Sequence, residues 1–172
     1  MHDLNLLVWN HDMTAKLEVY VSPAEYADLA KTSDWQTSWI SKAARGMPNK
    51  VALRRSDDNE LLGLMSYEID RGALAVEIIY LESAAHSNAS LLSITGHGKK
   101  YIGIAKALIA YAAKVSVDSG FDGVLFFKAK TDELRKYYMR EFNAMPVSRC
   151  DPYRLVIWED VAAEILSEYE GA

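Results

Sequence analysis

Three short apolar runs separated by turn-forming residues occupy the middle of the chain. They cover Val51–Arg55, Leu61–Ile69 and Ala73–Glu82, and the connecting segments Ser56–Asn59 and Asp70–Gly72 contain Ser, Asp, Asn and Gly. Runs of strand length that are joined by short polar turns are typical of antiparallel strands. The pattern therefore predicts an antiparallel meander.

A strand and two helices are predicted ahead of the meander. Leu17–Val21 is a β-rich run, and Ser22–Pro23 has the form of a helix start, which predicts a helix over Ala24–Lys31. A second helix, which would stop at Gly46–Pro48, is indicated by residues that recur every four positions. These residues are Trp35, Trp39 and Ala43.

The meander is followed by a polar stretch and then by a strongly periodic one. Ser83–Lys100 is rich in Ser, His, Asn, Thr and Gly, so we expect a long loop. The next segment carries an apolar stripe at helical spacing and has Gly120 as its stop, which predicts a helix. The stripe consists of Ile104, Leu108, Ala112 and Val115.

The remainder of the chain alternates between strand and helix patterns. Gly123–Phe127 is a compact apolar run that suits a buried strand, and Thr131 can cap a following helix that has acids in its first turn. Arg154–Trp158 predicts a last strand, and Asp160–Tyr169 a last helix. The order of elements predicts a mixed sheet with helices packed on it.

Composition narrows the class of protein. The 172 residues, half of them hydrophobic, are enough for one buried core, so we predict a single domain over residues 1–172. The 19 basic and 24 acidic residues give a net charge of −5, which argues against bulk binding of nucleic acid. No apolar run approaches the roughly 20 residues that cross a bilayer. A single cysteine and a start without the pattern of a secretory signal favour a cytoplasmic protein.

The segment Lys100–Ala105 carries candidate chemistry because it lies where the polar stretch gives way to the helix. Gly103 and Ala105 keep side chains away from the first helical turn, so its unpaired backbone N–H groups can approach a phosphate at the positive end of the helix dipole. Lys99 and Lys100 add positive charge. The segment lacks the third glycine of a Rossmann fingerprint and the ending of a Walker loop. The segment therefore predicts a site for a nucleotide-like ligand that is bound by neither of these two motifs.

The same segment resembles the coenzyme A signature of the GNAT family of N-acetyltransferases, Arg/Gln-x-x-Gly-x-Gly/Ala, with Lys100 in the first position. Thr131, Leu134 and Tyr138 resemble the Asn-x-x-Ala-x-x-x-Tyr pattern of that family, and Phe142–Ala144 is similar to the Leu-Gly-Ala-like ending of a bacterial branch. The resemblance covers roughly residues 61–147. It implies the GNAT fold, an α/β (α+β) arrangement in which a mixed, mostly antiparallel central sheet has splayed middle strands and helices on both faces.

The resemblance also implies a cofactor and roles for named residues. The cofactor would be acetyl-CoA (coenzyme A), with no metal, and its amide groups would pair with the edge of the last meander strand. The proton acceptor would be Glu82, favoured by its position, or Glu77 or a water molecule, and the two glutamates lie on opposite faces of a regular strand. Tyr138 would be the general acid. The residues implied to bind the cofactor are Leu81, Glu82, Ser83, Lys99, Lys100, Tyr101, Ile102, Gly103, Ile104, Ala105, Thr131 and Tyr138.

Ordinary structural roles compete with these assignments. Taken alone, Tyr138 is a packing tyrosine, and Glu77 and Glu82 are solvated positions on a half-exposed sheet. His86 and His97 lie in the polar stretch without Cys or Asp neighbours at ligand spacing, so we read them as loop residues and predict no metal site.

The acceptor is not encoded in any motif. The first hypothesis is an N-acetyltransferase that acts by direct attack of a small-molecule or peptide amine. One alternative is a catalytically weak regulatory module that binds coenzyme A. The other is a toxin-like enzyme that acetylates aminoacyl-tRNA, which ranks last because the composition shows no basic excess. Formation of a homodimer is left open.

Overall fold

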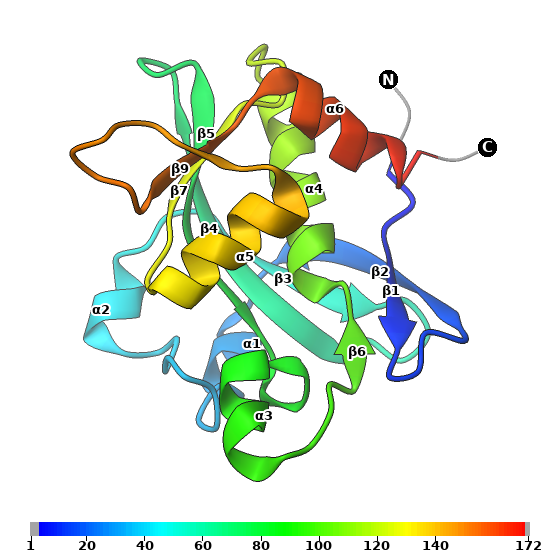
Figure 1. Cartoon of the computed structure of the whole chain (residues 1–172). Helices are drawn as coiled ribbons and strands as arrows, with labels where there is room; N and C mark the ends of the chain where they lie inside the picture. The colour runs from blue at the N-terminus through cyan, green and yellow to red at the C-terminus, as the bar shows by residue number, and fades with distance from the viewer. Residues whose placement is uncertain (1–3, 171–172) are drawn as a thin grey trace. The chain divides into compact units, whose positions relative to one another are not determined.

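The computed structural model describes residues 4–170 (Figure 1). These residues divide into two compact units. Unit 2 comprises Asn5–Ser66 and Tyr80–Leu108, and unit 1 comprises residue 4, Tyr67–Ile79 and residues 109–170. Three elements contribute residues to both units. They are β4 (Leu61–Asp70), β5 (Ala75–Ser83) and α4 (Ile104–Asp118). The single domain therefore stays a prediction, and each unit is described by itself.

Unit 2 is built on antiparallel strands. Its strands besides β4 and the end of β5 are β1 (Leu7–Asn10), β2 (Lys16–Pro23), β3 (Lys50–Arg55) and β6 (Tyr101–Ile102). They follow the order β6-β1-β2-β3-β4, in which the neighbours are antiparallel. The short helices are α1 (Tyr26–Ala30), α2 (Lys42–Arg45), the 3₁₀ turn η1 (Ala85–Ser87) and α3 (Ala89–Thr95). A core cluster of Trp39, Ala52 and Leu64 is completely buried.

Unit 1 contains the parallel strand pair. The first part of β5 pairs in parallel with β7 (Leu125–Lys128), through the register Val76 to Leu125. The strand β7 pairs antiparallel with β9 (Arg154–Ile157), and β8 (Met145–Pro146) follows as the edge strand. The helices are α5 (Asp132–Phe142) and α6 (Glu159–Ser167). The sheet strands are thus mostly antiparallel with one parallel pair, as the sequence predicts.

Several predicted elements are confirmed. The meander corresponds to β3, β4 and β5, and the apolar stripe from Ile104 onward corresponds to α4, whose Ile104, Leu108 and Ala112 are buried. Thr131 caps α5, since its hydroxyl accepts a hydrogen bond of 3.1 Å from the Leu134 N–H.

The predicted helix around Trp35 and Trp39 is wrong. Apart from α2, residues 33–46 form mainly turns and bends, and several of their N–H groups bond to side chains instead of to a helical ladder. The Trp39 N–H donates to the Thr32 hydroxyl at 2.9 Å, and two further N–H groups of the segment donate to Glu82. The predicted helix Ala24–Lys31 is shorter than expected, since Ser22 and Pro23 still belong to β2.

The stretch predicted as a plain loop over Ser83–Lys100 contains η1 and α3, so that prediction is also wrong. Asn88 caps α3 by accepting hydrogen bonds from the N–H groups of Ser90 and Leu91. Gly96 ends the helix with φ +74. The strands β1, β6 and β8, of four residues or fewer, were not predicted.

Candidate functional site

The predicted phosphate-binding segment consists of a short strand and a helix start in unit 2. Tyr101 and Ile102 form β6, which pairs with β1, and α4 begins at Ile104. Gly103 between them has φ +98, which side chains of L-residues rarely tolerate. A Cβ built on Gly103 meets nothing within 4 Å. The backbone conformation of this residue, rather than a lack of space, therefore calls for glycine.

Polar contacts around Glu60 hold β6 in place. Glu60, Arg55, Lys100 and Tyr101 make these contacts and are called the Glu60 hub. The Lys100 Nζ donates to Glu60 Oε1 at 2.8 Å, and the Tyr101 hydroxyl donates to Oε2 at 2.5 Å. Arg55 Nη1 donates to the Tyr101 hydroxyl at 2.8 Å. Burial raises the pKa of Glu60, but the bonds from Lys100 and Tyr101 outweigh it and leave the pKa below its ordinary value. The charge of Lys100 is thus already paired.

His86 borders the Glu60 hub. Its Nε2 lies 3.4 Å from Glu60 Oε1, its Nδ1 lies 2.7 Å from the Ser87 hydroxyl, and its ring stands edge-on to Tyr101. Burial lowers the pKa of His86, which favours the neutral ring. Among the described residues, no group of three or more His, Cys, Asp or Glu side chains converges as metal ligands would. No sequence motif indicates the hub, because Glu60 and Lys100 are 40 positions apart.

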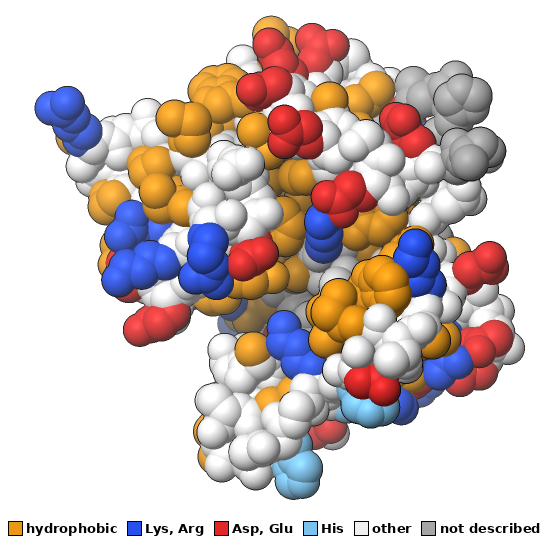
Figure 2. Space-filling model, turned by 45° about the vertical axis from the view of Figure 1, so that its right-hand side comes forward, with side chains coloured by type: hydrophobic (Ala, Val, Ile, Leu, Met, Phe, Trp, Pro, Cys, Tyr) orange, Lys and Arg blue, Asp and Glu red, His pale blue; other side chains and the backbone are white. Residues whose placement is uncertain are grey.

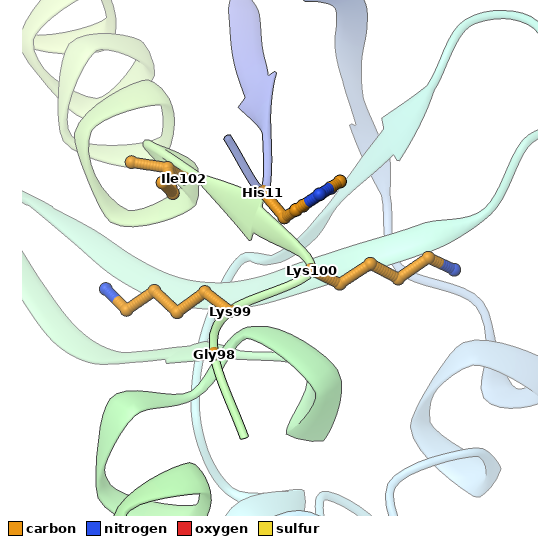
Figure 3. A pocket seen from close by; sticks show the side chains of 5 residues that line it. All are labelled: His11, Gly98, Lys99, Lys100 and Ile102. Atoms are coloured by element: carbon orange, nitrogen blue, oxygen red, sulfur yellow. The ribbon is translucent and has the colours of Figure 1, made fainter. Parts of the chain in front are cut away.

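An open pocket of about 440 Å³ lies along the same segment. It is lined by His11, Gly98, Lys99, Lys100 and Ile102. Figure 3 shows the side chains of Lys99 and Lys100 extending to opposite sides of the chain. Within residues 4–170 we find no hydrogen bond or ion pair of the Lys99 ammonium, whereas Lys100 is bonded to Glu60. Of the two lysines, Lys99 is therefore the one whose charge no described side chain neutralises.

The outgoing end of β5 carries Leu81, Glu82 and Ser83, also in unit 2. The side chain of Glu82 is buried, at 3% exposure, whereas Leu81 and Ser83 are half-buried. Glu82 Oε2 accepts the Gln36 N–H at 2.8 Å, and Oε1 accepts the Thr37 N–H at 3.2 Å. The alternative interpretation of Glu82 as a solvated surface position is wrong, because this carboxylate accepts hydrogen bonds from backbone donors inside the unit.

The remaining candidates lie in unit 1. Tyr138, on α5, packs edge-on against Phe127 of β7 with 4.9 Å between ring centroids, and it also contacts Phe142. Burial raises the pKa of the adjacent Tyr137. Glu77 is half-buried on β5 and pairs across the sheet with Phe126. Tyr138 thus has an aromatic setting, in contact with the rings of Phe127, Tyr137 and Phe142.

The fold has counterparts among solved structures, although no protein-family model and no curated protein matches the sequence. A tyrosine-to-phenylalanine mutant of KacT is similar with a TM-score of 0.55 at 12% identity, over 86% of this chain and 98% of that one. A GNAT-family acetyltransferase from Listeria monocytogenes is similar with a TM-score of 0.54 at 11% identity, over 81% of this chain and 94% of that one. The chain has the GNAT fold. AtaT complexed with acetyl-methionyl-tRNAfMet is a further counterpart of this GNAT-fold chain, with a TM-score of 0.50 at 14% identity, over 87% of this chain and 99% of that one.

These similarities confirm the predicted fold, and at such identities they speak for the fold alone. Within the described part of this GNAT-fold chain, no helix has both the length and the apolar character needed to cross a bilayer.

Proposed function

We propose that this chain is an N-acetyltransferase that moves the acetyl group of acetyl-CoA to an amine. The observation that carries the proposal is the entry into α4: Gly103 at φ +98 directly precedes the helix, and the neighbouring pocket is lined by Lys99. Free N–H groups of a first helical turn and an unpaired ammonium suit a phosphate-bearing ligand. The chain also shares its fold with a protein described as a GNAT-family acetyltransferase from Listeria monocytogenes.

Acetyl-CoA fits these residues as a donor substrate. Its phosphates would be held by the backbone at Gly103–Ala105 and by Lys99, whereas Lys100 would act through Glu60 on the shape of β6. Its amide arm would pair with the edge of Leu81–Ser83. The thioester supplies the activated acetyl group.

Residues of this chain would accept and donate the protons of the reaction. The acceptor nitrogen attacks the thioester carbonyl, so that a C–N bond forms and the C–S bond breaks. The proton that the amine loses passes to a carboxylate, Glu82 or Glu77, or to water, and Tyr138 protonates the departing thiolate. Cys150 is exposed and takes no part in this direct route.

The first experiment is calorimetric titration with acetyl-CoA, followed by measurement of thiol release with a panel of amines. Lys99→Gln should weaken binding by about tenfold, through the loss of a charge-assisted contact, and Lys100→Gln should weaken it less. Tyr138→Phe should lower turnover at unchanged affinity, while its neighbour variant Tyr137→Phe should leave turnover near wild type. Binding without turnover on any amine would favour the regulatory module, and no binding at all would refute the proposal.

A second candidate function is that the acceptor amine is the α-amino group of an aminoacyl-tRNA. The observation in its favour is a local charge excess in unit 1: residues 128–154 contain seven Lys or Arg but four Asp or Glu. Figure 2 shows Lys and Arg side chains gathered over α5 and the segment that follows it. AtaT, one of the structural counterparts, has been captured with acetyl-methionyl-tRNAfMet. The exclusion of nucleic acid from the net charge is therefore no longer supported.

Binding of labelled tRNA tests this second function. Lys136 and Arg140 on α5 are about two-thirds exposed, at 66% and 67%, and each forms a surface ion pair, Lys136 with Asp132 and Arg140 with Glu141. The double variant Lys136→Glu/Arg140→Glu should weaken tRNA binding and lower the slope of log affinity against log salt by about two. The matched control is Lys42→Glu/Arg45→Glu on α2. Equal losses in both variants would show only a general charge effect and would refute a tRNA surface on α5.

A further inference from the structure

The carboxylate of Glu82 accepts hydrogen bonds from the backbone of a loop that is distant in the sequence. Besides the N–H groups of Gln36 and Thr37, its Oε1 lies 3.4 Å from the indole nitrogen of Trp39, which donates to it. These donors are more than 40 positions away in the sequence. The segment that carries them, residues 32–39, is called the 32–39 loop below.

The 32–39 loop has no ladder of its own to satisfy its N–H groups. Within it, the Trp39 N–H donates to the Thr32 hydroxyl, and the Thr37 hydroxyl lies 2.5 Å from that of Tyr80. The Trp39 ring is fully buried and stands edge-on to Tyr80, which precedes Glu82 on the same face of β5. Buried backbone donors need acceptors, and here the end of β5 provides them.

We propose that Glu82 is a positioning residue, which anchors the 32–39 loop to the end of β5, and that the proton of the amine goes elsewhere. A carboxylate that took up a proton here would present an O–H donor to groups that are themselves donors. The loop would lose an acceptor at that moment, which costs free energy in a buried place. This arrangement of donors therefore suits a Glu82 carboxylate that remains ionised, and so remains a hydrogen-bond acceptor, throughout the reaction.

The consequence for the reaction rests on the proposed function. Glu82 stands between Leu81 and Ser83, the edge proposed to pair with the donor's amide arm. The anchored loop is thus kept in a fixed position beside that edge. Its exposed polar residues are Ser33, Asp34, Gln36 and Ser38. Loosening the anchor should affect how the amine binds, while the protonation step keeps its pH dependence.

Amide hydrogen exchange tests the anchor without any need for activity. In Glu82→Gln, the side-chain amide can accept at one atom only, so exchange at Gln36 and Thr37 should speed up by about tenfold or more. The matched control is Glu68→Gln, which makes the same chemical change at an exposed position of β4. Because Glu82→Gln risks misfolding, Glu82→Asp serves as a second variant. It keeps the charge but withdraws the carboxylate by one methylene from the N–H groups of Gln36 and Thr37, and should speed exchange at the same two amides.

The rate profile tests the second half of the proposal. If the enzyme turns over, Glu82→Gln should raise KM for the amine and leave the acidic limb of kcat/KM at the wild-type pH. Loss or displacement of that limb would make Glu82 the base and overturn the proposal, as would unchanged exchange at Gln36 and Thr37. A protein that binds no acetyl-CoA would refute the proposed function, and the exchange data would still decide whether Glu82 anchors the loop.

Discussion

Gly63 lies in β4 beneath the first turn of α4, where a side chain has no room. A Cβ at this position would stand 2.9 Å from Cγ2 of Ile104, 3.2 Å from Cδ1 of Leu108 and 3.1 Å from the carbonyl oxygen of Glu82. Favourable carbon contacts are at about 3.5–4.0 Å. The two side-chain ends can move, but the carbonyl belongs to the backbone of β5. Gly63→Ala should therefore push the start of α4 away from the sheet.

The size of the effect follows from two opposing contributions. Overpacking in a filled core costs about 1–3 kcal/mol, and replacing glycine by alanine stabilises by about 0.4–1 kcal/mol through the unfolded chain. The net loss should be roughly 1–2 kcal/mol, read as a lower urea midpoint at an unchanged slope. Gly46→Ala is the control, because a Cβ at Gly46 meets nothing within 4 Å and its φ is −81. A Gly63→Ala protein as stable as Gly46→Ala would refute the reasoning.

Three further changes test other parts of the molecule. Asp28→Asn breaks the buried ion pair with Arg54 and should cost about 3 kcal/mol at neutral pH by urea unfolding. Burial acts to raise the pKa of Asp28, but its bond with Arg54 leaves it lowered, so the wild-type advantage is present above pH 3.8 and should vanish as the pH falls through the lower folded value. Thr131→Ala removes the cap of α5 and should cost about 1 kcal/mol by urea unfolding. Gly103→Ala should cost about 1–3 kcal/mol by urea unfolding and weaken acetyl-CoA binding.

The parts of the fold that the sequence predicts are those whose pattern arises from local periodicity. The apolar stripe of α4 repeats because one face of the helix is buried, and the meander strands are bounded by turn residues that specify them. Trp35 and Trp39 have the same spacing of four for a different reason. Trp39 fills a core cluster with Ala52 and Leu64 from within an irregular segment, so its burial depends on distant partners. Spacing alone does not separate the two cases.

The candidate site shows the same division between local and distant causes. Gly103 was predicted as a small residue at a helix start, and the structure adds a positive φ that only the chain around it determines. Lys100 differs from Lys99 because it bonds to Glu60, which is 40 positions away in the sequence. Glu82 bonds to the backbone of Gln36, which is 46 positions away. A motif identifies which residues are near a ligand site. It does not say which of them already has a partner.

The net charge of the chain is a poor guide to its binding partners, because the charged residues are unevenly distributed along it. Seven of the 19 basic residues but only four of the 24 acidic ones lie between Lys128 and Arg154, so the remainder of the chain is the source of the net negative charge. At physiological salt, charges are screened beyond about 8 Å. A polyanion that approaches residues 128–154 therefore experiences their local excess of positive charge, not the net charge of −5. A tRNA acceptor is compatible with an acidic protein for this reason, and the α5 charge variants, rather than the isoelectric point, decide between the two acceptor classes.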